Sequence, residues 1–325
     1  MEFGILSTAG IAQKSVIPAI EASDHRVGAI ASRTPNRARS VADEFSIPRH
    51  YGTYEALVDD DSIDAVYIPL PNGLHAEWIR RAADAGLHVL CEKPLTVDAD
   101  EARAVDAYCE ERGVTLMEAF MYRFHPRTER ALELADTSLG EVRSVSSSFK
   151  FSLYGAPEDI RLDPALAGGS LMDVGCYAVS AARQFLGEPK RVYAHMDDSR
   201  QTGVDTEFAA ILEYETGASA RIASGFDTPK VQRYRVEGSN GWIEVTDAFD
   251  APLDEQLELT YEIDGQYGRE TFEPVDQYRL EVDHFADCAA AGRRPRTDGV
   301  EAIANMRVID ALYESAGRGG PVDLP

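Results

Sequence analysis

Short apolar runs alternate with longer stretches of helical periodicity over the first 120 residues. The apolar runs are rich in Val, Ile and Leu without strict alternation, which is typical of strands covered on both faces. They predict strands at 3–7, 26–32, 64–70, 88–92 and 114–119. Apolar residues at helical spacing predict the intervening helices, at 11–23, 36–45, 74–86 and 99–113. This alternation favours crossover connections, and we expect an α/β Rossmann domain with a doubly wound parallel sheet.

The pattern changes after about residue 122, where period-two alternation begins to dominate. Strands are predicted at 141–153 and near 190–197, 207–215, 218–226, 231–237 and 241–246. Asp264–Gly265 is typical of a tight hairpin turn. Helices are predicted at 126–136, 170–186, 277–291 and 299–315. We expect an α+β domain with an open, mostly antiparallel sheet whose uncovered face meets water or a second subunit, which favours a homodimer or a dimer of dimers.

Charge narrows the class of protein further. The 325 residues include 56 acidic and 32 basic ones, for a formal net charge of −24, and only five of the basic residues are Lys. An acidic, Lys-poor surface stays hydrated where salt screens its self-repulsion, so we interpret the chain as a protein of a salt-rich cell. An ordinary acidic enzyme is the alternative. Nucleic acid is not an expected partner, because such a chain repels phosphates.

The distribution of apolar and cysteine residues points to the cytoplasm. There is no run of eighteen apolar residues, and the N-terminus lacks the basic and apolar regions of a secretion signal. No membrane partner is expected. The cysteines are scattered without a CxxC pair, which argues against disulfides or a zinc site and for a reducing compartment: Cys91, Cys109, Cys176 and Cys288.

The turn after the first strand, GILSTAGIA at 4–12, stands where a nucleotide-binding fold holds phosphate. Ser7, Ala9 and Ala12 occupy the small-residue positions of the GxGxxG or GxGxxA fingerprint. Small residues allow a pyrophosphate to approach the helix N-terminus. An ordinary tight turn is the alternative. The predicted cofactor contacts here are Ser7, Thr8, Ala9, Gly10 and Ile11.

The second strand ends on Ser32 and Arg33, and Arg37 follows one helical turn later. An NAD-specific site usually has a carboxylate here for the ribose 2′-hydroxyl. A hydroxyl with two guanidinium groups instead suits a 2′-phosphate. The sequence therefore predicts NADP rather than NAD, with solvated surface arginines as the alternative.

Two more strand ends carry candidate residues. The third strand runs into a loop broken by prolines, where Pro69, Leu70, Asn72 and His75 are predicted to contact the cofactor. Ligands of open α/β sheets lie at this edge. A histidine that only starts or packs a helix is the alternative for His75. The fourth strand ends in Glu92-Lys93-Pro94, and both Glu92 and Lys93 are predicted at the cofactor.

These motifs together resemble the glucose–fructose oxidoreductase/inositol dehydrogenase (Gfo/Idh/MocA) family. The resemblance covers GILSTAGIA, LPNGLHAEW, GLHVLCEKPL, LMEAFMYRFHP and DIRLDPALAGGSLMDVGCY. It is nearest to the branch that holds NADP-linked D-xylose 1-dehydrogenases and dimeric trans-dihydrodiol dehydrogenases. It implies a dinucleotide cofactor, sugar-like substrates and two domains: an NADP-binding domain at 1–122, and a substrate-binding and dimerisation domain at 123–325 whose C-terminal helix can pack back on the first.

The resemblance also implies a catalytic pair, Lys93 and Tyr177, with Asp173 one turn before the tyrosine. A free tyrosine has a pKa near ~10, and a nearby ammonium lowers it. Lys93 would supply charge and a hydrogen bond, Tyr177 would exchange the proton, and Asp173 would orient the substrate hydroxyl or Lys93. The alternatives are packing for Tyr177, a first-turn carboxylate for Asp173 and a surface lysine for Lys93.

The substrate chamber is expected between the two domains. Arg161 is its predicted polar contact and Arg123 a predicted contact to substrate or cofactor, while Tyr122, Phe151 and Tyr278 are predicted walls or core residues. The leading hypothesis is an NADP-dependent dehydrogenase that oxidises the anomeric carbon of D-xylose or D-glucose to the lactone. The alternatives are a trans-dihydrodiol dehydrogenase, a keto-sugar reductase and a non-catalytic NADP sensor. No metal site is expected, because no cluster has ligand spacing.

Overall fold

The computed structural model describes residues 1–325 and divides the chain into two compact units. Unit 1 comprises Met1–Met121 and Tyr278–Ile303, and unit 2 comprises Tyr122–Gln277 and Ala304–Pro325. Residues 278–303 therefore join the first unit, whereas the sequence-based division at 122 placed them in the second. Helix α8 explains the difference, since its Phe285 ring packs 6.0 Å from Phe3 of the first strand.

Unit 1 is built on a parallel sheet of six strands in the order β3-β2-β1-β4-β5-β6. This is the doubly wound order of a Rossmann fold, so the predicted fold class is confirmed. Apart from the short edge strand β3, the strands are almost entirely buried, as their unbroken apolar runs require. They are β1 (Glu2–Leu6), β2 (Arg26–Ala31), β3 (Arg49–Tyr51), β4 (Ala65–Ile68), β5 (His88–Glu92) and β6 (Leu116–Ala119).

Helices connect these strands, as the crossover pattern predicts. A π-helical turn, Ala12–Val16, runs into α1, and a 3₁₀ turn, Asn72–Leu74, runs into α4. Tyr54 and Trp78 meet edge to face at 5.1 Å within the core. The helices of this unit are α1 (Ile17–Glu21), α2 (Pro35–Phe45), α3 (Tyr54–Val58), α4 (His75–Asp84), α5 (Ala99–Arg112) and α8 (Gln277–Ala291), with the start of α9 (Gly299–Arg318).

Unit 2 contains a sheet of nine strands in the order β14-β13-β12-β11-β7-β10-β9-β8-β15. Only β7 and β10 pair in parallel, so the predicted mostly antiparallel sheet is confirmed. Asp264 and Gly265, both at positive φ, form the predicted hairpin turn. The strands are β7 (Val142–Lys150), β8 (Arg191–Asp197), β9 (Glu207–Glu213), β10 (Ser219–Gly225), β11 (Val231–Gly238), β12 (Gly241–Thr246), β13 (Leu257–Ile263), β14 (Gln266–Phe272) and β15 (Val322–Asp323).

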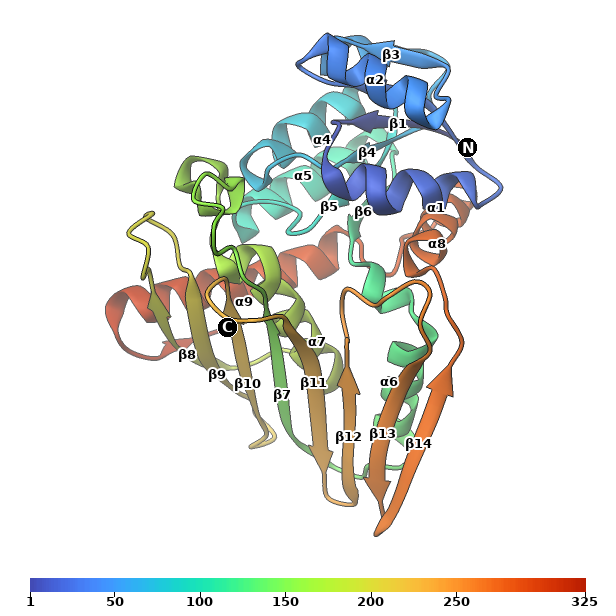
Figure 1. The fold of residues 1–325 in the computed structure, drawn as a ribbon. Coiled ribbons are helices and arrows are strands. Elements are labelled where there is room, and N and C mark those ends of the chain that lie inside the picture. The colour runs from blue at the N-terminus through green and yellow to red at the C-terminus, as the bar shows by residue number, and fades with distance from the viewer. The chain divides into compact units, whose positions relative to one another are not determined.

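Helices cover one face of this sheet (Figure 1). Helix α7 (Cys176–Leu186), entered through a π-helical turn at Leu171–Gly175, packs on β7, β10 and β11. Helix α6 (Pro126–Thr137) packs on β12 and β13. Short 3₁₀ turns lie at Met121–Phe124, Ile160–Leu162 and Pro164–Leu166.

One helical stretch, Pro164–Leu186, is long and apolar enough to cross a membrane by composition. In the fold, 72% of its apolar window is buried inside the protein. It therefore serves as a core helix of unit 2.

Candidate active site

The predicted cofactor-binding segments gather at one edge of the six-stranded sheet. Each follows the carboxyl end of a strand, and the strands are parallel, so the loops after β1, β2, β4 and β5 lie on the same side. The switch point of a doubly wound sheet lies at this edge, between β1 and β4. Unit 1 thus presents the loops a dinucleotide needs where this fold binds one.

The turn after β1 keeps a glycine-like backbone without the glycine. Ser7 has φ of +152°, a conformation that L-residues rarely adopt. A Cβ built on Gly10 meets no heavy atom within 4 Å, so space is open at the predicted phosphate position. Gln13 Nε2 donates to the carbonyl of Thr8 at 2.8 Å and holds the turn, which also includes Ala9 and Ile11. The turn is therefore open on the side of Gly10, and its contacts with the cofactor phosphates stay a prediction.

The end of β2 offers uncompensated positive charge. Ser32 is buried, and its Oγ accepts a hydrogen bond from the amide of Thr34 at 3.2 Å. Arg33 and Arg37 are exposed, and neither makes an ion pair. Arg39, on the same helix, faces Asp43 at 3.8 Å. In so acidic a chain, two free guanidinium groups beside a hydroxyl suit an anionic group such as a 2′-phosphate.

His75 is the first residue of α4, and its side chain is buried. Its ring has no exposed surface, with Nδ1 2.9 Å from the carbonyl oxygen of Pro94 and Nε2 2.8 Å from that of Leu70. Burial lowers the pKa of His75, against the effect of the two carbonyl oxygens. These contacts fit the packing alternative, in which His75 ties the loop after β4, with Pro69, Leu70 and Asn72, to the segment after Lys93, and the predicted contact of His75 with the cofactor stays a prediction.

Lys93 follows the last residue of β5, and the Lys93–Pro94 peptide bond is cis. Hydrogen bonds to the carboxylates of Glu92 and Glu118 hold the residues on either side of Lys93 in place. Tyr67 donates its hydroxyl to Glu92 Oε1 at 2.6 Å, and the amide of Leu95 donates to Glu118 Oε1 at 2.7 Å. Burial, with Glu92 beside it, raises the pKa of Tyr67 far above its usual value, so Tyr67 remains a donor.

In unit 2 the glycine pair that precedes Asp173 is required by close packing. A Cβ on Gly168 would lie 2.4 Å from the carbonyl oxygen of Arg161, and Gly169 has φ of +116°. Arg161 Nε pairs with Asp173 Oδ2 at 2.9 Å, and its guanidinium lies 5.7 Å from the ring centre of Phe151. The structure thus brings the predicted substrate residues Phe151, Arg161 and Asp173 together.

Tyr177 stands in an aromatic cluster one turn beyond Asp173. Its ring lies 5.7 Å from Tyr122, 5.4 Å from Phe149 and 5.4 Å from Phe249. Tyr122 donates its hydroxyl to Ser180 Oγ at 2.8 Å and accepts from Gln184 Nε2 at 2.6 Å. Tyr122 therefore packs against Tyr177 within unit 2. This position fits the core alternative for Tyr122 rather than a wall of the substrate chamber.

The remaining predicted residues fall at the ends of the units. Arg123 lies in the 3₁₀ turn Met121–Phe124, at the start of unit 2. Tyr278 is the second residue of α8, belongs to unit 1 and acts electrostatically on Tyr67. The roles predicted for them, and the pairing of Lys93 with Tyr177, stay predictions.

Two buried polar residues of this region were missed by sequence reasoning. Glu118 lies fully buried in β6, and Tyr67 lies fully buried in β4. A carboxylate inside an apolar strand was the available signal for Glu118, because such a group is buried only when it is hydrogen-bonded. Tyr67 carried no signal, since tyrosine is common in strands.

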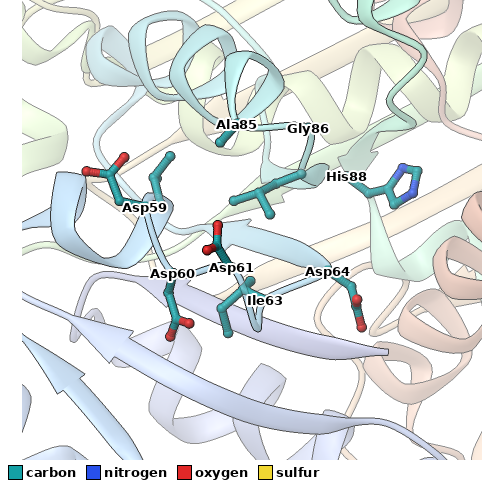
Figure 2. Close-up of a pocket in the computed structure, with 10 residues that line it drawn as sticks. Asp59, Asp60, Asp61, Ile63, Asp64, Ala85, Gly86 and His88 are labelled. Atoms are coloured by element: carbon teal, nitrogen blue, oxygen red, sulfur yellow. The ribbon is translucent and has the colours of Figure 1, made fainter.

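A cavity of about 500 Å³ lies at the opposite edge of the six-stranded sheet (Figure 2). It is lined by four aspartates and by His88, at the residues where β4 and β5 begin. Burial alone would raise the pKa of Asp60, but hydrogen bonds from Ser62, Tyr51 and Arg49 lower it to about 2. So acidic a cavity repels phosphate, and it is not the cofactor site.

A parallel doubly wound unit with an open turn after its first strand, followed by a unit that carries the Arg161–Asp173 ion pair and Tyr177 one helical turn later, is typical of a dinucleotide-dependent oxidoreductase of two domains. Residues 1–120 match the model of the oxidoreductase family with an NAD-binding Rossmann fold, and residues 131–244 match the Gfo/Idh/MocA C-terminal domain. The chain belongs to the Gfo/Idh/MocA family.

Relatives within the family cover the whole chain. The protein is 60% identical over 324 residues to the D-xylose 1-dehydrogenase (NADP⁺) 2 of Haloferax volcanii, covering 100% of both chains. A 3-ketoreductase from Actinomadura kijaniata, solved with NADP and TDP-benzene, is 33% identical with a TM-score of 0.92 over 97% of both chains. An aldose–aldose oxidoreductase from Caulobacter crescentus, solved with glycerol, is 32% identical with a TM-score of 0.92 over 100% of this chain and 99% of that one.

Proposed function

We propose that the protein is an NADP-dependent aldose 1-dehydrogenase that oxidises D-xylose to its lactone. The observation that carries the proposal is the 60% identity, over the full length of both chains, to a D-xylose 1-dehydrogenase that uses NADP⁺. The free Arg33 and Arg37 beside Ser32 support NADP as the cofactor. The match to an oxidoreductase family with an NAD-binding Rossmann fold supports hydride-transfer chemistry.

In this proposal each site residue has one task. When bound, NADP⁺ supplies the acceptor for the hydride that leaves C1 of the sugar. Tyr177 accepts the proton of the C1 hydroxyl, and the ammonium of Lys93 donates a hydrogen bond and favours the phenolate. Asp173, held by Arg161 at 2.9 Å, orients the substrate hydroxyls. The turn Ser7–Ile11 and Ser32, Arg33 and Arg37 hold the cofactor phosphates.

A substrate panel tests the proposal. Purified protein in molar salt, which its charge of −24 calls for, is given NADP⁺ or NAD⁺ with D-xylose, D-glucose and other aldoses. We expect reduced nicotinamide to accumulate with D-xylose and NADP⁺, and more slowly with NAD⁺. Absence of turnover on every aldose, with activity on another substrate, would contradict the proposal.

The same panel addresses a second candidate, which the A. kijaniata structure favours through its fold-wide similarity at a TM-score of 0.92. A keto-sugar reductase would consume NADPH with keto-sugars. A trans-dihydrodiol dehydrogenase would reduce NADP⁺ with the diol; the enzyme of that name from Sus scrofa is 32% identical over 252 residues. A non-catalytic sensor would bind NADP and turn over nothing.

We also propose that the protein is a homodimer, or a dimer of dimers, joined through the open face of the nine-stranded sheet. Tyr193 of β8 and Ile211 of β9 are cross-strand neighbours on that face, exposed by 48% and 47%. Small side chains such as Ala209 and Ala223 continue the face and keep it flat. An extended, partly apolar sheet face is a usual subunit interface. The four cysteines are free and scattered along the chain, which supports a reducing compartment such as the cytoplasm.

A further inference from the structure

A buried carboxylate holds the start of the segment that carries Asp173 and Tyr177. Asp205 lies in the loop between β8 and β9 and is 3% exposed. Its Oδ2 accepts from Ser170 Oγ at 2.7 Å and from the amide of Leu171 at 2.8 Å. Its backbone carbonyl accepts from the amide of Ser170 at 2.8 Å. Three hydrogen bonds thus join one loop residue to two successive residues of the helical entry.

The other carboxylate oxygen of Asp205 reaches a different helix. Tyr313 of α9 donates its hydroxyl to Asp205 Oδ1 at 2.8 Å. A Cβ on Gly169 would lie 2.4 Å from that oxygen and 3.0 Å from the Tyr313 hydroxyl. Glycine at 169 is therefore what allows the carboxylate to approach the backbone so closely. The hydrogen bond between Tyr313 and Asp205 joins the β8–β9 loop to α9. Through Asp205 it also joins α9 to the helical segment that begins at Ser170.

We call the hydrogen bonds of Asp205 to Ser170, Leu171 and Tyr313 the clamp. The segment that it holds runs on to Asp173 and Tyr177, the predicted catalytic residues of unit 2. The amide of Asp173 donates to the carbonyl of Gly169 at 3.0 Å, so the position of residue 169 sets that of Asp173. Tyr177 follows on the next turn of the same helical run. No cation pairs with Asp205; its charge faces the first amide of the π-helical turn and two hydroxyl groups. Burial raises the pKa of Asp205, while these hydrogen bonds oppose the rise.

We propose that Asp205, with Ser170 and Tyr313, is a positioning residue that fixes Asp173 and Tyr177 for reaction. The inference rests on the proposed function for its kinetic consequence and on the contacts of Asp205 for its structural part. Small misplacements of reacting groups cost up to about 10²-fold in rate. Loss of the clamp is thus expected to lower kcat while leaving NADP binding, which belongs to unit 1, unchanged.

The experiment compares Asp205→Ala, Asp205→Asn and a matched control, Asp198→Ala. Asp198 lies in the same loop and accepts hydrogen bonds from the amides of Thr202 and Gly203, and it makes no hydrogen bond to residues 169–171. Asparagine keeps an acceptor oxygen for Ser170 and Leu171. We expect kcat for D-xylose to fall by about 10- to 100-fold in Asp205→Ala, with recovery to within about 3-fold of wild type in Asp205→Asn. The Kd for NADP⁺ stays within about 2-fold, and Asp198→Ala keeps kcat within about 2-fold, as expected for a site outside the reaction.

Hydrogen exchange at the amides of 170–173 gives a readout independent of activity. We expect it to accelerate in Asp205→Ala and not in Asp198→Ala. Equal kcat in the Asp205 and Asp198 variants, or equal exchange, overturns the proposal. If wild-type protein turns over no aldose, the proposed function fails while the exchange result alone decides the clamp. Should Asp205→Ala not fold, Ser170→Ala and Tyr313→Phe, each lacking one hydroxyl, replace it with the same expected direction.

Discussion

Ser7 has a backbone conformation that is usual for glycine. The fingerprint places glycine at this turn, and the chain retains φ of +152° with a serine in its place. Such a conformation strains an L-residue, at a cost on the order of 1 kcal/mol. The sequence pattern predicted the turn correctly, but it could not show that the glycine conformation persists without glycine.

Replacing Ser7 with glycine should therefore stabilise the protein by about 1 kcal/mol, because the strain is removed. The measurement is the free energy of unfolding in urea at constant salt. Ser40→Gly is the matched control: Ser40 is exposed within α2, where glycine costs about 0.5–1 kcal/mol. A Ser7→Gly protein no more stable than wild type would show that the turn is not strained.

Arg33 is the residue on which cofactor choice is expected to depend. Arg33→Asp replaces an unpaired cation with a charge that repels a 2′-phosphate. A hydrogen bond to a charged group contributes about 1.5–3 kcal/mol, so the ratio of kcat/KM for NADP⁺ over NAD⁺ should fall by at least about 10-fold. Arg39→Asp, whose side chain faces Asp43 on the same helix, is the control and should leave the ratio unchanged. An unchanged ratio in Arg33→Asp would mean that the residues at the end of β2 do not bind the 2′-phosphate of NADP⁺.

At the scale of elements, the apolar pattern predicted the parallel strands except β3, and it predicted most of the second sheet. β3 is an edge strand of the six-stranded sheet and is three residues long. β15 is an edge strand of the nine-stranded sheet and is two residues long. Edge strands this short carry too few residues for a period to appear. The π-helical turns before α1 and α7 were also missed, because their apolar spacing is that of an ordinary helix.

The residues of the candidate site also divide into those that the sequence could predict and those that it could not. Residues that follow a strand end, such as Lys93 and Ser32, could be found from the sequence, because strand ends predict position. Asp205 and His75 depend on contacts between segments 19 to 35 residues apart. Nothing local distinguishes Asp205 from the other acidic loop residues of a chain with 56 of them.

Helix α6 carries a titratable cap that should make stability depend on pH. His125 Nδ1 accepts from the amide of Arg127 at 3.0 Å, so the ring is neutral in the fold. Burial, with Arg127 beside it, lowers the pKa of His125 to about 4. The unfolded chain takes up a proton near pH 6.5, so between pH 6.5 and 4 the unfolded state binds more protons and stability falls with falling pH. Above pH 6.5 the contribution is complete.

His125→Asn keeps a capping oxygen but does not titrate. Between pH 7.5 and 5 the free energy of unfolding should fall less in His125→Asn than in wild type, by about 2 kcal/mol. Urea unfolding at both pH values measures the difference, and His195→Asn, on the exposed part of β8, is the control. Parallel pH profiles for His125→Asn and wild type would contradict a neutral buried cap.

At the scale of the whole molecule, charge and the open sheet face act in opposite directions on the proposed association of subunits. A net charge of −24 opposes association at low salt. The partly apolar face around Tyr193 and Ile211 favours it. Both effects act on the same equilibrium, so the proposed dimer should form more readily when salt screens the charge.

Ile211→Glu places a charge on that face and should convert the proposed dimer to monomer in molar salt. Desolvating an unpaired carboxylate at the centre of an interface costs several kcal/mol. Sedimentation velocity measures the change, and Val300→Glu, which alters an exposed apolar residue of α9 instead, is the control. A wild-type monomer, or an Ile211→Glu protein that stays dimeric, would contradict this interface.

The central claim is that Tyr177 takes the proton while C1 of the sugar loses its hydride to NADP⁺. The most direct test is kcat for D-xylose oxidation by Tyr177→Phe in molar salt, with NADP⁺ binding measured on the same sample. Positioned proton transfer contributes about 10²–10⁴-fold, so kcat should fall by at least about 100-fold with the Kd for NADP⁺ unchanged. A Tyr177→Phe enzyme that retains more than about a tenth of the wild-type kcat would contradict the account.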